Sequence, residues 1–69
     1  MPKTIKNFVK LHRTNLKLTQ EELSNSIGVT RQTIIALEKG NYAPSLLLAL
    51  KIAHFFKKPV EVIFKVGSK

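Results

Sequence analysis

The chain has 69 residues, and 12 Lys and Arg against 4 Asp and Glu give it a net charge of +8 at pH 7. A chain this short forms one domain, here residues 1–69, and the lack of cysteine excludes disulfides and thiolate metal sites. Its apolar runs are too short for a membrane span and its N-terminus lacks a signal-peptide pattern, so we expect a cytoplasmic protein without a membrane partner. The positive charge predicts attraction to a polyanion: nucleic acid, an anionic membrane surface or an acidic protein.

The first predicted element is an amphipathic helix over residues 5–15. Its apolar stripe, at helical spacing, consists of Ile5, Phe8, Val9, His12 and Leu16. We interpret His12 on this stripe as a partly buried histidine. It lies far along the chain from His54, without the spacing of a metal site, and so we expect neither a metal nor another cofactor.

A helix-turn-helix is predicted over residues 19–39. Thr19 and Glu22 have the spacing of a capping box, which begins a helix, and Gly28 ends that helix in the left-handed conformation that glycine adopts easily. A further helix over residues 31–39 follows directly. Two short helices joined by such a turn are typical of this motif.

The outward face of the helix over residues 31–39 carries groups that can read DNA. At about 100° per residue, Ile34 and Leu37 face the core. An α-helix fits the major groove, where arginine pairs with guanine, glutamine pairs with adenine and apolar groups contact thymine methyls. Base contacts are therefore expected from the opposite face, through Arg31, Gln32, Ile35 and Ala36.

Polar side chains around the same helix predict contacts to DNA phosphates. They carry hydroxyl, amide or ammonium donors, and they are Gln20, Thr30, Thr33, Lys39, Asn41 and Tyr42. Each is a weak signal alone, because surface polar residues are usually only solvated. The prediction depends on their placement around one helix-turn-helix.

The C-terminal third is predicted to be helical. Ser45 caps a helix over residues 46–56, which is apolar nearly all round and is expected to be the central core helix or to have a second apolar partner. Pro59 begins a short helix over residues 60–64, and residues 66–69 form a tail. The predicted fold class is all-α with five helices, and a short terminal strand is left open as an addition to it.

Four blocks of sequence, in order, resemble the lambda-repressor/Cro-like (XRE) helix-turn-helix family. They are LTQEEL at residues 18–23, IGVTRQTI at 27–34, ALEKG at 36–40 and PSL at 44–46. The resemblance extends from about residue 9 to about residue 64. The short chain is similar to stand-alone dimeric members, such as those of the cytolysin repressor type.

This resemblance implies a five-helix lambda-repressor-like DNA-binding domain, with the helix-turn-helix formed by the second and third helices. It implies the phosphate and base contacts named above. It also implies a structural ion pair between Arg13 in the first helix and Glu38 near the end of the third. Ile35 and Leu47 depart from the family pattern as exposed apolar residues, and Leu47 fits either a subunit interface or a repacked core.

A homodimer is expected, because one helix-turn-helix reads only a few base pairs. A two-fold dimer reads two half-sites about 34–36 Å apart. The expected interface lies at about residues 59–67 and the helix before it, and it consists of Phe55, Val60, Val62, Ile63, Phe64 and Val66. The alternative is that these side chains only complete the core of one chain.

The expected function is that of a sequence-specific regulator of transcription that binds double-stranded DNA at the nucleoid, most often as a repressor on a palindromic operator. An antitoxin or a restriction–modification controller on the same fold, and a protein- or RNA-binding adaptor, are the alternatives. A cationic membrane-active peptide fits poorly, because caps and glycines interrupt the chain. We expect no enzyme, since no nucleophile–base constellation is visible, and no small-molecule ligand is evident.

Overall fold

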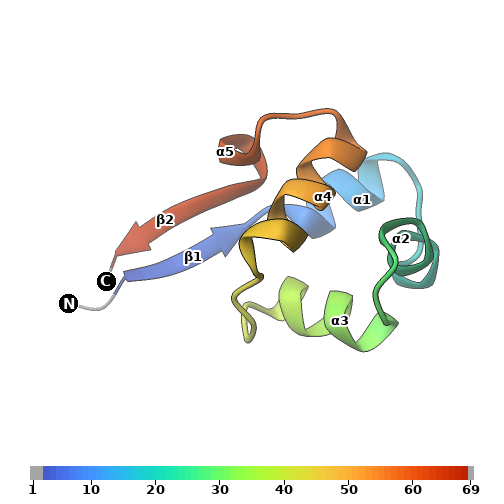
Figure 1. Ribbon diagram of the computed structural model, residues 1–69, viewed down its shortest axis with the longest axis horizontal. Coiled ribbons are helices and arrows are strands. Elements are labelled where there is room, and N and C mark those ends of the chain that lie inside the picture. Colours follow the sequence, from blue (N-terminus) through green and yellow to red (C-terminus); the bar gives the residue numbers. More distant parts are fainter. Residues whose placement is uncertain (1–2, 69) are drawn as a thin grey trace.

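The computed structural model describes residues 3–68, which form five helices and two strands (Figure 1). In chain order the elements are β1 (Lys3–Asn7), α1 (Val9–Asn15), α2 (Gln20–Ile27), α3 (Arg31–Lys39), α4 (Leu46–Phe56), α5 (Val60–Ile63) and β2 (Phe64–Ser68). The five-helix, mostly helical fold and its helix-turn-helix are confirmed. None of the helices described here is long and apolar enough to cross a membrane.

The two ends of the chain pair as an antiparallel sheet, which projects from the helical body (Figure 1). Ile5 lies opposite Val66 and Asn7 lies opposite Phe64. The prediction of a helix from residue 5 is therefore wrong, because α1 begins at Val9. The predicted C-terminal tail is also a strand as far as Ser68, and Lys69 lies outside the described residues. The terminal strand left open by the sequence is confirmed, and it has a partner.

The two errors have one cause, because strand pairing between the chain ends leaves no local signal. Ile5 and Val66 are β-branched residues that suit a strand. In the sequence alone, however, the apolar spacing of Ile5 continued that of the following helix. Phe64, assigned to the end of the last helix, has φ −124° and ψ 132° and begins β2 instead.

The core lies where all five helices converge. Its fully buried large side chains come from α1, α2, α3, α4 and α5, and they are Val9, Leu23, Ile34, Leu37, Ile52 and Ile63. The predicted inward side of the third helix is confirmed. Leu16, placed on the first helix's apolar stripe, is exposed instead, because α1 ends at Asn15 and Leu16 lies in the turn that follows.

His12 is half-buried, as the sequence indicated, and its ring packs on Phe56. The two ring centroids are 5.6 Å apart with the planes tilted by 42°. This contact joins α1 to the end of α4. The described residues contain no cluster of three or more His, Cys, Asp or Glu that could hold a metal ion.

The end of α4 stores backbone strain at Lys57. This residue has φ 57° and ψ 43°, a left-handed conformation that costs a residue with a side chain about 1–2 kcal/mol and that glycine adopts freely. We expect Lys57→Gly to stabilise the fold by about 0.5–1 kcal/mol after the entropy of the more flexible unfolded chain is subtracted. Urea unfolding measures this. Lys58→Gly, at a neighbouring residue without a positive φ, should destabilise the fold instead, and an equal gain there would contradict the strain.

Candidate nucleic-acid interface

The helix-turn-helix is held by local caps at the start of α2, at the end of α2 and at the start of α3. The Glu22 backbone N–H donates to the Thr19 hydroxyl at 3.0 Å, and the Thr19 N–H donates to the Glu22 carboxylate at 2.8 Å, so the predicted capping box is present. Gly28 ends α2 with φ +88°. Thr30 then caps α3 by accepting from the Thr33 N–H. These contacts fix the orientation of α3 relative to α2 through a connection of only three residues.

The outward face of α3 presents the side chains that the sequence selected for base reading. Arg31 and Gln32 are exposed, whereas Ile34 and Leu37 on the other side are fully buried. Ala36 is half-buried. Ile35 was expected to be exposed and is half-buried too.

The candidate phosphate ligands surround this helix in three places. The Thr30 and Thr33 hydroxyl oxygens lie 3.1 Å apart at its N-terminus. Lys39 is exposed at its C-terminus, and Asn41 and Tyr42 are exposed in the loop that follows. Thr33 and Gln20, the latter at the start of α2, are half-buried.

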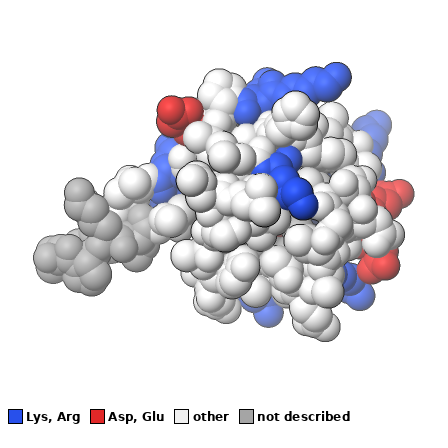
Figure 2. Space-filling view, in the orientation of Figure 1, with Lys and Arg blue, Asp and Glu red and all other residues white. Residues whose placement is uncertain are grey.

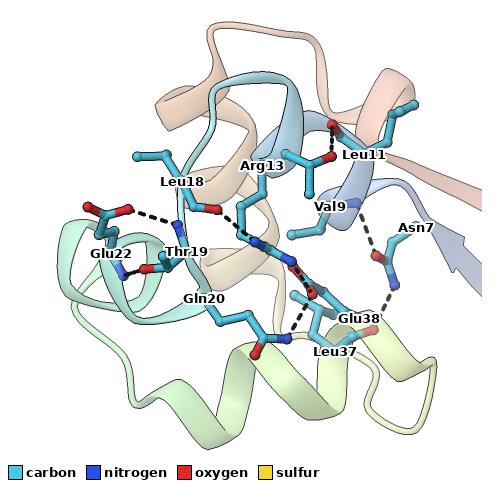
Figure 3. A network of polar contacts seen from close by, with 11 residues as sticks. Asn7, Val9, Leu11, Arg13, Leu18, Thr19, Gln20, Glu22, Leu37 and Glu38 are labelled. Atoms are coloured by element: carbon cyan, nitrogen blue, oxygen red, sulfur yellow. Dashed lines mark hydrogen bonds and ion pairs between the residues drawn. The ribbon is translucent and has the colours of Figure 1, made fainter.

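The side chain of Gln20 takes part in a polar network inside the fold (Figure 3). Its Nε2 group donates to Oε1 of Glu38 at 3.0 Å. A side-chain amide nitrogen has two N–H donors, so this bond leaves one N–H and the carbonyl oxygen for another partner. The bond to Glu38 fixes where that remaining donor can point.

Arg13 and Glu38 form the centre of this network, as the family resemblance implies. The Arg13 Nε and Nη2 atoms donate to the two Glu38 carboxylate oxygens at 2.7 Å and 3.1 Å, and Nη1 donates to the Leu18 carbonyl at 2.7 Å. The exposed fractions of the two side chains are only 9% and 4%. A bidentate, buried pair of this kind links α1, the turn before α2 and α3.

Sequence reasoning missed Asn7, which also holds α3. Its Nδ2 group donates to the Leu37 carbonyl at 2.9 Å, and its Oδ1 accepts from the Val9 N–H at 3.1 Å. The second bond has a local signal, because an asparagine side chain often accepts from the backbone N–H two residues further along the chain, as in an Asx-turn. The first joins residues 30 positions apart and has none.

The face of the molecule that Figure 2 shows carries few charged side chains over α4. In Figure 1, α4 crosses the middle of the view, and Figure 2 shows a mostly uncharged surface there, with one basic side chain near its centre and the other Lys and Arg around its edge. The one charged residue of α4, Lys51, is exposed. The exposed part of α4 contributes Leu46, Leu47 and Leu50 to this surface. Sequence reasoning had marked only Leu47, because a helix that is apolar all round does not reveal which side is covered.

Comparison with known proteins finds the helix-turn-helix family HTH_3 over residues 9–63. An uncharacterized HTH-type transcriptional regulator of Methanocaldococcus jannaschii is 57% identical over 60 residues, which cover 87% of this chain and 91% of that protein. The cryptic phage CTXphi transcriptional repressor RstR of Vibrio cholerae is 42% identical over 48 residues, covering 70% of this chain and 43% of the repressor. The fold is similar to the crystal structure of a Bacteroides fragilis protein to which DNA binding has been attributed, with a TM-score of 0.79 at 19% identity over 90% of this chain and 100% of that chain.

Proposed function

The chain belongs to the XRE-type helix-turn-helix family of transcriptional regulators, and on that premise we propose that it represses transcription by binding a palindromic DNA operator as a homodimer. The observation that carries the proposal is the exposed face of α3. Arg31 and Gln32 are exposed on this face, whereas Ile34 and Leu37 on the other side of the helix are fully buried. The name of the 42% identical relative, a phage transcriptional repressor, favours repression.

Sequence would be read by the first turns of α3. Arg31 has the donors for a bidentate contact to guanine, and Gln32 has the donor and acceptor that adenine requires. Ala36 and the exposed part of Ile35 lie on the same side and suit thymine methyl groups. Affinity without sequence preference would come from the net charge of +8, through release of counterions from the DNA.

Phosphate contacts would come from both ends of the motif. Gln20 retains one amide N–H that does not donate to Glu38, and the Thr33 hydroxyl is available at the N-terminus of α3. Lys39 and the loop residues Asn41 and Tyr42 would hold the backbone at the other end. Thr30, whose hydroxyl already caps α3, would act by supporting Thr33.

A second copy of the chain would pack on the exposed, mostly apolar side of α4, where Lys51 is the one charged residue of the helix. Two copies with a net charge of +8 repel one another, so a stable contact requires a face with few charges. Leu46 and Leu50, four residues apart on one side of α4, are 74% and 48% exposed. Exposed apolar groups that lie together on one face of a soluble domain are typical of an interaction surface.

This surface revises the interface expected from sequence. Ile63 is 0% exposed, so its side chain belongs to the core of its own chain and is removed from the interface. Val62 and Val66 are exposed, and Phe55, Val60 and Phe64 are half-buried, so these five stay in the proposal. Leu46, Leu47 and Leu50 are added.

Selection of bound sites from random duplex DNA at physiological salt tests the proposal. We expect a palindrome whose half-sites are centred one helical turn, about 34–36 Å, apart. A promoter that overlaps the selected site should be silenced by the protein in a reporter assay. Binding that is sensitive to salt but blind to sequence would reject the proposal, as would a preference for single-stranded RNA.

Two substitutions on α3 separate base reading from phosphate binding. Arg31→Ala should weaken binding to the selected operator by about 1–3 kcal/mol and relax the preference at one base position. Lys39→Ala should weaken binding to all sequences alike and lower the salt slope by about one unit. Titrations of operator and random duplexes at several salt concentrations measure both. Equal losses on both duplexes for Arg31→Ala would contradict base reading.

A further inference from the structure

Asn7 joins three elements through one half-buried side chain (Figure 3). It is the last residue of β1, its Oδ1 accepts from the Val9 N–H at the start of α1, and its Nδ2 donates to the Leu37 carbonyl in α3. The pairing of Asn7 with Phe64 in the sheet, and a 2.8 Å bond from the Phe8 N–H to the Ile63 carbonyl, tie the same point to the C-terminal elements.

The Leu37 carbonyl lies in the C-terminal half of α3, which several other contacts also hold. The next residue, Glu38, accepts hydrogen bonds from Arg13 and Gln20, and the Leu37 side chain is fully buried. Asn7 therefore anchors the backbone of α3 at the same turn where Arg13 anchors its side. Arg31 and Gln32, proposed to read the bases, lie on the opposite face of α3. A rotation of α3 about the anchored Leu37 carbonyl would therefore move their side chains relative to the bases.

We propose that Asn7 is a positioning residue that sets the orientation of α3, and that it thereby couples the terminal sheet to operator recognition. The proposal deepens the function proposed above and its DNA measurements rest on that function. Specific binding needs several side chains to meet their base edges at once, whereas non-specific binding needs only the charge. Loss of the Asn7–Leu37 bond should therefore reduce specificity and leave general affinity unchanged.

Two neutral variants separate the two bonds of Asn7. Asn7→Ser keeps a side-chain oxygen near the Val9 N–H but is too short to reach the Leu37 carbonyl, and Asn7→Ala removes both bonds. Asn15→Ala, at an exposed asparagine that ends α1, is the matched control. None of these changes alters the net charge. The free energy of unfolding of each variant is measured first, and binding is then measured at a temperature where all are folded.

For both Asn7 variants we expect the ratio of operator affinity to random-duplex affinity to fall about five- to twentyfold, the size of a typical coupling between sites. Asn15→Ala should leave the ratio unchanged. If Asn7→Ser lowers stability but keeps the wild-type ratio, the residue is only structural and the proposal is overturned.

A measurement without DNA tests the role of Asn7 independently of the proposed function. Residual dipolar couplings in solution report the orientation of α3 relative to the β1–β2 sheet. We expect this orientation to shift or to become more variable in Asn7→Ser and to stay as in the wild type in Asn15→Ala. Unchanged couplings in Asn7→Ser overturn the proposal. A wild-type protein that prefers no DNA sequence would reject the proposed function, and the couplings would still show whether Asn7 positions α3.

Discussion

Replacement of Glu38 by alanine is expected to destabilise the fold by about 3–5 kcal/mol, because it leaves the buried Arg13 guanidinium without its partner. Only 9% of the Arg13 side chain is exposed, and two of its three hydrogen bonds end on the Glu38 carboxylate. The amide of Gln20 would lose its acceptor in the same variant. A small domain has only about 5–15 kcal/mol of stability in total, so this is a large fraction.

Urea unfolding of the single and double variants measures the effect. Arg13→Met combined with Glu38→Leu removes both charges and should be far less costly than either loss alone, because no buried charge remains. This comparison stays informative if Glu38→Ala does not fold. Glu61→Ala, at an exposed carboxylate of α5, is the control and should change the free energy of unfolding by less than about 0.5 kcal/mol. A cost below about 1 kcal/mol for Glu38→Ala would show that the pair adds little.

The helix-turn-helix could be predicted from sequence because its signals are local. The capping box of Thr19 and Glu22 and the left-handed glycines at positions 28 and 40 act within a few residues of the helix ends they define. The inward side of α3 follows from helical periodicity alone. The outward side, which carries Arg31 and Gln32, is then determined by elimination.

The terminal sheet could not be predicted in the same way, because its contacts join the two ends of the chain. Ile5 meets Val66 only after the helices between them have packed. Asn7 was missed for the same reason, since its bond to the Leu37 carbonyl depends on where β1 ends relative to α3. A local pattern shows which residues are apolar or capping, but it does not show what they meet.

The proposed interface on α4 could be predicted in part. The sequence showed that this helix is apolar on nearly every side and therefore needs either a central position or a second partner. The structure separates the sides: Ile52 is fully buried, whereas Leu46 and Leu50 face solvent. It equally shows that Ile63, which lies close to Val62 in sequence, belongs to the core.

Replacement of Leu50 by lysine is expected to separate the proposed dimer and to weaken operator binding about 100-fold or more. Leu50 lies beside Leu46 on the exposed side of α4, and a lysine there would place a further positive charge, and the same charge from the second copy, inside the contact. A dimer binds its second half-site as an intramolecular step, which raises affinity by about 10²–10⁴ over one half-site. The variant should keep the binding to an isolated half-site.

The added charge makes this test stringent, because one more lysine should increase general attraction to DNA rather than reduce it. A fall in operator affinity therefore cannot come from lost charge. Leu11→Lys, at a leucine of α1 that is 53% exposed, adds the same charge outside this face and should leave both dimer and operator binding intact. Light scattering gives the mass, and titrations of full and half operators give the affinities. Leu50→Lys that remains dimeric, or that loses operator and half-site binding equally, would place the contact elsewhere on the chain.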